Sequence, residues 1–371
     1  MFYYRYRSGS ELAMKELIYD ELYFASRDEC NDPYEGKIFA KFDADQNLWS
    51  TIICEALTSY SGEALSSLTD RIVAFFVQKS PIYVDEVLAS LDSGLAHLGE
   101  NDLEIRILKN MSIEISKHIL LHLPPEQYFA SFSRSRDNYL LWSHYANNHK
   151  GFCLIFRAEN GCLRQSDVWR KDSVPFAIKD ITMPHLFELH VPQSFEFRNV
   201  EYSPTPECMN GADFFSSSEW LCADDPEKSD LIMENYIRTY LQKHNVWDYE
   251  EETRIILPTG APFVMGRKVI IPPHHRLFHY ESNQLAGIVL GANMAPEQAR
   301  RIKDIVCEKV RRRNKRPCEE QSFHSFVIFK EQFSVSERKV ESKPIAICDG
   351  INVFDPAHPD FQNMLSEWES V

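Results

Sequence analysis

The stretch HNVWDYEEETRIIL, His244 to Leu257, places three consecutive glutamates shortly before a run of β-branched and apolar residues. That ending predicts a β-strand, in which successive side chains point to opposite faces. On this pattern one face carries Glu250, Glu252 and Arg254, and Glu251 points to the other face. Like charges on one strand face are unfavourable without compensation. The stretch therefore predicts either an exposed ion-pair ladder or a site that uses concentrated charge.

The composition is that of a folded, soluble protein. Of the 371 residues, 44% are hydrophobic and 12% are aromatic, which is too apolar for general disorder. The length exceeds that of a usual single domain, so one large domain with insertions and two smaller domains both fit the sequence.

The formal net charge of −15 argues against broad capture of nucleic acid or of an anionic membrane. The basic run Lys309 to Arg316 is a local exception, and its ordinary interpretation is the solvated end of a helix. The N-terminus shows no apolar signal region, and no stretch has the roughly 20 apolar residues of a membrane span. We therefore expect a cytoplasmic protein that makes no membrane contact.

The nine cysteines are scattered without a C-x-x-C pair, which favours reduced thiols over a disulfide framework or a zinc knuckle. The pair His274-His275 has no neighbours at a convincing metal-ligand spacing. The sequence therefore predicts no metal site.

Periodicity and turn residues predict a mixture of strands and helices without internal repeats. The predicted strands are Phe2–Arg7, Leu22–Ser26, Tyr128–Ser133, Gly151–Phe156 and Gly287–Leu290, with fragments at Phe187–Val191 and Ser194–Tyr202. Helices are predicted after an N-cap at Ser10, within Asp137–Lys150, and over Lys228–Lys243 and Pro296–Val310.

A helical pattern fills residues 48–123, in segments such as Leu65–Gln78, Ile82–Leu98 and Leu103–Leu121. We therefore predict a mixed α+β protein whose central, mostly antiparallel sheet is interrupted by a helical insertion or cap. The expected divisions are residues 1–47 and 126–335 for the sheet domain, 48–125 for the insertion and 336–371 for a C-terminal extension.

Five ordered pieces of the chain carry a resemblance to a known family. They are YYRYRS at Tyr3, LYFASRDECNDPYEG at Leu22, SFSRSRDNYLLWSHYANNHKGFCLIF at Ser131, VWDYEEETRIIL at Val246 and LAGIVLGANMAPEQ at Leu285. In their order and spacing the chain resembles the bacterial domain of unknown function 2971 family (DUF2971). That family name implies no activity.

The layout of these pieces is remotely similar to the ADP-ribosyltransferase fold, particularly to DNA-modifying toxins. Arginine-modifying members of that superfamily use an arginine, a Ser-x-Ser strand and a Glu-x-Glu pair. Here Arg5, the segment Ser131 to Ser133, and the segment Glu250 to Glu252 match those parts. The resemblance implies NAD as a substrate and an ADP-ribosyltransferase-like sheet.

The chemistry of NAD cleavage gives the acidic stretch a role. Breaking the nicotinamide–ribose bond passes through an oxocarbenium-like state, which a carboxylate stabilises electrostatically. Glu250 and Glu252 are the predicted catalytic residues, one at the ribose and one orienting or deprotonating the acceptor. Arg254 would keep both ionised or meet a phosphate.

Further candidates follow from the same resemblance. The predicted nucleotide contacts are Arg5, Ser26, Asn31, Asp32, Ser131, Ser133 and Arg254. An Asx-type turn is the ordinary structural role of the Asn31-Asp32-Pro33 segment. His144 is a third catalytic candidate, and its ordinary role is that of a hydrogen-bonded structural histidine.

The sequence thus predicts an NAD-consuming ADP-ribosyltransferase-like enzyme or NAD glycohydrolase, a toxin or anti-phage effector acting on a protein or nucleic-acid acceptor. The alternative is a non-enzymatic sensor that binds a nucleotide or a partner protein of a defence system. A metal-dependent nuclease built from Asp32, His144 and Glu250 is a third class, without a specific ligand signature.

Overall fold

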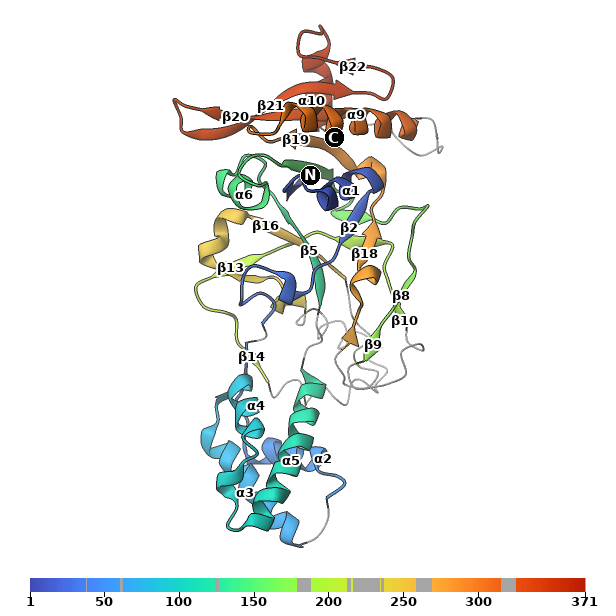
Figure 1. Cartoon of the computed structure of the whole chain (residues 1–371). Coiled ribbons are helices and arrows are strands. Elements are labelled where there is room, and N and C mark those ends of the chain that lie inside the picture. The colour runs from blue at the N-terminus through green and yellow to red at the C-terminus, as the bar shows by residue number, and fades with distance from the viewer. Residues whose placement is uncertain are drawn as a thin grey trace.

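Figure 1 shows the chain as a computed structural model. The structure describes residues 1–371 except 38, 61–62, 124–126, 179–187, 212–214, 216–233, 235–236, 258–268, 315–324 and 371.

A large sheet forms the centre of the molecule, and its strand order is β12-β16-β5-β1-β6-β19-β20-β21-β22. The bounds are β12 Arg198–Asn199, β16 Glu252–Leu257, β5 Tyr128–Ser133, β1 Phe2–Arg7, β6 Phe152–Arg157, β19 Leu285–Leu290, β20 Phe326–Ser334, β21 Lys339–Cys348 and β22 Val353–Phe354. Neighbours run antiparallel, apart from the parallel pair β19 and β20. The predicted mixed α+β class with a mostly antiparallel sheet is confirmed.

Helices cover both faces of this sheet, so its central strands are apolar on both sides. One face packs against α1, Glu11–Tyr19, and α9, Pro296–Asn314. The other packs against α6, Tyr139–Tyr145, and α10, Phe361–Ser370. As predicted, α1 follows an N-cap at Ser10, whose side chain accepts a hydrogen bond from the Ala13 amide.

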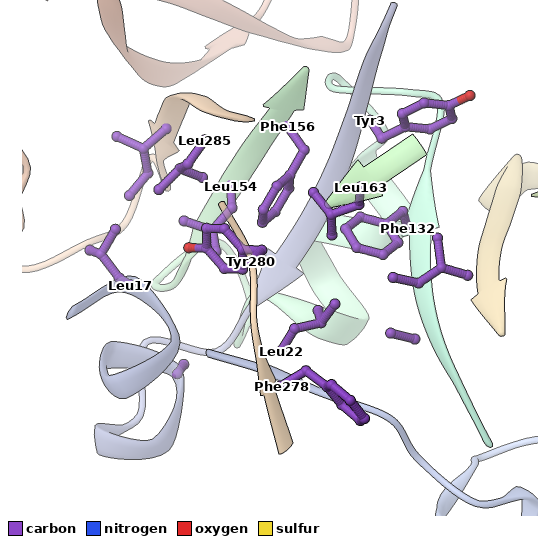
Figure 2. Packing of buried hydrophobic residues seen from close by; sticks show 14 of the residues in the cluster. Tyr3, Leu17, Leu22, Phe132, Leu154, Phe156, Leu163, Phe278, Tyr280 and Leu285 are labelled. Carbon is purple, nitrogen blue, oxygen red and sulfur yellow. The ribbon is translucent and has the colours of Figure 1, made fainter. Parts of the chain in front are cut away.

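The core on the first face is rich in aromatic rings. Figure 2 shows Tyr280 packed among Leu17, Leu154, Phe156 and Leu285, and the rings of Phe156 and Tyr280 meet edge to face at 4.9 Å. Because these side chains come from a helix, two central strands and a distant loop, their contacts hold these elements together.

The helical region has a separate core. Its helices are α2 Gln46–Ala56, α3 Glu63–Lys79, α4 Val84–Asp92 and α5 Asp102–His122. They enclose the side chains of Trp49, Ile72 and Phe76, among others. In Figure 1 this bundle projects from the sheet at the end of the molecule opposite β22.

The predicted helical segment Ile82–Leu98 is confirmed over α4 but differs at its start and after Asp92. Residues Ile82–Tyr83 form a short strand, β4, beside β3, Ala40–Phe42, which also pairs with β14, Met209–Asn210. Helix α4 ends at Asp92 because Gly94 and Leu95 both have left-handed backbones, and a short helix, η2 Ala96–Leu98, follows.

Short strand pairs extend the sheet region. They are β2 Glu21–Tyr23 with β18 Leu277–His279, β7 Cys162–Arg164 with β11 Ser194–Glu196, β8 Ser173–Pro175 with β10 Glu188–His190, β9 Ala177–Ile178 with β17 Val269–Ile270, and β13 Glu201–Ser203 with β15 Gln242–His244. The predicted strand Ser194–Tyr202 is divided among β11, β12 and β13, and of the predicted strand Phe187–Val191 the first residue lies outside the described residues.

The predicted helix Lys228–Lys243 is wrong at its end, where Lys243 lies in β15. Its residues 228–233 and 235–236 lie outside the described residues.

The acidic stretch does not form one strand. A 3₁₀ helix, η4 Asn245–Glu250, is followed by Glu251 with a left-handed φ of 43°, and β16 begins only at Glu252. The amide of Glu251 donates to the Asp248 carbonyl, and the carbonyl of Glu251 accepts from the Arg134 amide. This turn, rather than strand alternation, brings Glu250 and Glu252 to the same side.

The sheet contains a gap between β1 and β5. These strands pair only at Tyr4 and Ser133, whereas β1 pairs with β6 from Phe2 through Arg7. Farther along β5, Phe129 bridges to Ala25, so the segment after β2 takes the place of β1. The divergence opens a space inside the sheet.

Candidate functional site

A cavity of about 340 Å³ lies at the gap between β1 and β5. Its walls come from β1, the segment from Tyr23 to Glu35, β5, α6, and the residues around η4. The volume is in the range of small-molecule pockets in proteins. Among the described residues, none that lines the cavity comes from the helical bundle.

One end of the cavity is a buried ion cluster. The Nζ of Lys243 lies 2.7 Å from Glu250, 3.1 Å from Glu252 and 3.6 Å from Glu35. Arg254 lies beneath, 2.8 Å from Glu252 and also paired with Glu35. The five side chains are at most 5% exposed. Two cations thus face three carboxylates in a place from which water is largely excluded.

The carboxylates of this cluster differ in their proton affinity. Burial opposes the charge of Glu252, but Arg254 and Lys243 outweigh it and lower its pKa to about 2. At Glu35 burial dominates, and the pKa is raised despite the same two cations. Burial also opposes the charge of Lys243, but the neighbouring carboxylates raise its pKa above the ordinary value. Glu252 is therefore a fixed negative charge at neutral pH and a poor proton acceptor.

Glu250 has a second partner on the cavity side. Its Oε1 accepts a hydrogen bond of 2.7 Å from the hydroxyl of Tyr145, and that hydroxyl accepts one of 3.0 Å from the Asn31 amide group. Burial, followed by the charge of Glu250, raises the pKa of Tyr145. The phenol therefore stays protonated and holds the carboxylate in place.

The Arg5 end of the cavity is cationic. Arg5 is 7% exposed and donates through Nη1 to the carbonyl of Ser131 at 2.8 Å. Its Nε lies 3.5 Å from Glu16, which also receives both arms of the Arg7 guanidinium. Burial and then Arg7 lower the pKa of Arg5 to about 10, against the effect of Glu16. Two guanidiniums sharing one carboxylate leave a net positive charge here.

Most of the predicted site residues meet in this cavity. Those that line it are Arg5, Asn31, Ser131, Ser133, Glu250 and Glu252. The Ser133 hydroxyl donates to the Glu250 carbonyl at 2.8 Å, and Ser131 hydrogen-bonds Glu252. The two serines thus connect β5 to both carboxylate-bearing residues.

Four predicted residues do not line the cavity. Ser26 hydrogen-bonds Glu29, and Asp32 accepts from the Tyr34 amide at 2.9 Å in an Asx-type turn. Arg254 is fully buried under Glu252. His144 is exposed, with its ring 6.4 Å from that of Tyr145.

Three site residues were missed by the sequence reasoning: Glu35, Tyr145 and Lys243. The sequence pattern predicts Lys243 as the last residue of a helix. The signal that points to Lys243 is electrostatic, because two buried carboxylates need a nearby cation. Glu35 lies more than two hundred residues from Arg254 in sequence, and no local pattern links them.

The part of the chain that the structure describes also lacks two common features. No group of three or more histidine, cysteine, aspartate and glutamate side chains there could hold a metal ion. None of the helices in that part of the chain combines the length and apolar character of a membrane span.

The fold and the site together define a mixed α+β protein with a charged cavity in a divided antiparallel sheet. Residues 141–255 match the model of a family described as protein of unknown function (DUF2971). This segment contains Tyr145, Lys243, Glu250 and Glu252, and the match supports the resemblance to that family. No curated protein and no solved structure matches the chain.

Proposed function

We propose that the chain is an NAD-consuming, ADP-ribosyltransferase-like enzyme whose reaction takes place in the cavity between β1 and β5. The observation that carries the proposal is the meeting of three separate motifs. Arg5, the Ser131 to Ser133 segment, and Glu252 lie on β1, β5 and β16, which are consecutive in the sheet, and all of them line one cavity.

The charge distribution of the cavity also supports a dinucleotide ligand. Guanidinium groups form charge-assisted hydrogen bonds with phosphate oxygens, which suits the Arg5 end to a diphosphate. Carboxylates accept hydrogen bonds from ribose hydroxyls and stabilise an adjacent positive charge, which suits the Glu252 end to the reacting ribose.

In the proposed reaction the carbon–nitrogen bond between ribose and nicotinamide breaks, and neutral nicotinamide leaves with the bonding electron pair. The fixed negative charge of Glu252 stabilises the oxocarbenium-like ribose. An acceptor hydroxyl, amine or water forms the new bond to that carbon, and its proton passes to Glu250. Tyr145 orients Glu250 through the 2.7 Å hydrogen bond.

A second candidate function is a nucleotide sensor without turnover. Lys243 lies between Glu250 and Glu252 and contacts both, which favours a structural role for these carboxylates. The cavity would then bind a nucleotide, and its occupancy would be read by a partner protein. A toxin or anti-phage role, with a protein or nucleic-acid acceptor, stays a prediction.

Incubation of the purified full chain with NAD, with and without cell extract, tests the proposal. Nicotinamide release that depends on the chain supports the enzyme, and transfer of label to a macromolecule distinguishes a transferase from a glycohydrolase. Tight NAD binding measured by calorimetry without release supports the sensor. Neither binding nor release removes both proposals.

A further inference from the structure

Two cysteines meet at a place remote from the cavity. Cys307 lies in α9 and Cys348 is the last residue of β21, and their sulfur atoms are 3.6 Å apart. Both are free thiols in this structure. Neither residue lines the cavity between β1 and β5.

The surroundings of the two sulfurs differ. Cys348 is 1% exposed and belongs to the core that α9 covers, whereas Cys307 is only partly buried and packs against that core. A solution oxidant therefore reaches Cys307 first. The buried Cys348 is already at the distance from which a second thiol can attack.

The electrostatics favour a reactive thiol on the accessible side. The hydrogen bond shared with Cys348 lowers the pKa of Cys307 to about 7, an effect that burial and the charge of Asp304 oppose and that Arg311 and Lys303 assist. The same contact raises the pKa of Cys348. The thiolate, which is the nucleophilic form, is thus concentrated on Cys307.

We propose that Cys307 and Cys348 form a redox modification site, at which hydrogen peroxide converts the two thiols into an intramolecular disulfide. The 3.6 Å sulfur separation requires only a small approach to reach a bond of about 2.05 Å.

The reaction takes place in two steps. The Cys307 thiolate attacks one peroxide oxygen, so that a sulfur–oxygen bond forms, the oxygen–oxygen bond breaks and hydroxide leaves, which takes up a proton to give water. The sulfur of Cys348 then attacks Cys307, so that the sulfur–sulfur bond forms and the sulfur–oxygen bond breaks. The departing hydroxide combines with the Cys348 proton to give water. Two thiols are oxidised and one peroxide is reduced to two waters.

The bond would connect α9 to β21 and close a loop of about 40 residues, which restricts the unfolded chain. We therefore expect the oxidised protein to melt several degrees higher than the reduced one. This outcome is independent of any activity on NAD.

The test treats the reduced full chain with one to five molar equivalents of hydrogen peroxide and then labels the remaining thiols under denaturing conditions. We expect about two fewer labelled thiols than in the untreated protein and one cross-linked peptide pair. The mass of the unlabelled chain should be lower by about 2 Da. Cys307→Ser and Cys348→Ala should each abolish the cross-link, and Cys54→Ser, which alters an exposed thiol, should leave it intact.

Accumulation of sulfinic acid at Cys307 without the cross-link would overturn the proposal, and so would an unreactive Cys307. If either variant fails to fold, as judged by circular dichroism, the melting temperatures of wild type before and after oxidation decide. An unchanged melting temperature together with an absent cross-linked peptide rejects the site.

Discussion

At the scale of single residues, Glu252 is the centre of the candidate site. It touches Lys243, Arg254 and Ser131, so that its charge is held by three contacts. Glu250 is held from the other side by Tyr145. Glu251 lies between them in sequence and is exposed, so the three consecutive glutamates can be compared directly.

Replacing each glutamate by glutamine should separate these roles. We expect Glu250→Gln and Glu252→Gln to cost about 3 kcal/mol or more of transition-state stabilisation, because each removes a charge from the reacting end of the cavity. Glu251→Gln should change stability by about 0.5 kcal/mol or less. The measurement is kcat/KM for nicotinamide release beside the melting temperature. Activity equal to that of wild type in all three variants would remove this turn from the site, and loss only in Glu251→Gln would show that the acting carboxylate is the exposed one.

The two arginines of β1 allow a second comparison. Arg7 is occupied by both oxygens of Glu16, whereas Arg5 lies deeper in the wall and holds only the Ser131 carbonyl at hydrogen-bond distance. Arg5→Ala should therefore weaken nucleotide binding at least tenfold, about 1.4 kcal/mol, and more than Arg7→Ala does. Isothermal titration with NAD measures both. If Arg5→Ala binds NAD as tightly as wild type does, Arg5 stabilises the cavity wall and does not contact the nucleotide.

The low pKa of Glu252 predicts the acid stability of the protein. A carboxyl group whose folded pKa is near 2, against about 4.5 when unfolded, adds stability that is complete above the unfolded value. That stability is lost as the pH falls from about 4.5 towards 2. We expect Glu252→Gln to flatten the dependence of the unfolding free energy on pH in this window.

Glu35→Gln is the matched control for this titration. Because the pKa of Glu35 is raised, its contribution is complete below its unfolded pKa and is lost as the pH rises through the folded value. Glu35→Gln should therefore still lose stability, as wild type does, when the pH falls below about 4.5. Urea unfolding between pH 2.5 and 7 measures both variants, and an equal flattening in the two would contradict the assignment to Glu252.

At the level of residues, the sequence predicted the carboxylates and the serines of the site but not their counter-charges. Arg5, Ser131, Ser133, Glu250 and Glu252 belong to short local patterns. Lys243 and Glu35 become part of the site only through the tertiary fold, which no periodicity records. The common side of Glu250 and Glu252 was predicted from strand alternation, and the actual cause is the left-handed turn at Glu251.

At the scale of elements, the close packing of β1 beside β6 depends on a glycine. A Cβ added to Gly151 would lie 1.9 Å from the Arg7 carbonyl oxygen, which cannot move without shifting β1. Helix α6 ends shortly before this glycine, and the strand that carries Arg5 lies beside it. The glycine directly before β6 thus also supports β1, which forms part of the cavity wall.

Gly151→Ala should destabilise the protein by about 3 kcal/mol, at the upper end of the cost of overpacking. Gly161→Ala is the control, since its added Cβ meets nothing within 4 Å and only its left-handed φ of 76° opposes the change. The control should cost about 1 kcal/mol. Urea unfolding of both variants checks the difference, and equal costs would show that the contact at Gly151 relaxes freely.

Element boundaries were predicted best where a breaker follows an apolar run. The predicted bounds of β1 and β5 agree with the structure, because alternating residues end at clear polar turns. Prediction failed where a non-glycine residue turns the chain: Leu95, directly after Gly94, and Glu251 both adopt left-handed backbones that non-glycine residues seldom adopt. Those conformations are imposed by surrounding contacts.

At the scale of the whole molecule, the helical bundle and the sheet have separate hydrophobic cores. Each should therefore unfold with some independence. The described residues of the bundle contribute no side chain to the cavity wall, so damage to the bundle core should leave the site able to bind.

Ile72→Ala in α3 tests this separation, because Ile72 is fully buried in the bundle core. We expect a loss of about 3 kcal/mol from the bundle with NAD affinity within about twofold of wild type. Ile288→Ala, at a fully buried position of β19, is the counterpart that should destabilise the sheet. Calorimetry and titration at a temperature where both variants are folded make the comparison. A matching loss of affinity in Ile72→Ala would show that the bundle controls the cavity.

The gap between β1 and β5 divides the central sheet into two parts that meet at a single pair of residues. Their backbone pairing is confined to Tyr4 and Ser133, and the other links across the gap are made by side chains: Arg5 holds the Ser131 carbonyl, and the Tyr6 hydroxyl holds those of Ser135 and Arg136. A backbone ladder can open only by unzipping, whereas a guanidinium can release a carbonyl by changing rotamer. The width of the gap therefore depends on a few side-chain torsions. A ligand that draws Arg5 away from Ser131 would change this width without breaking any backbone pairing between strands.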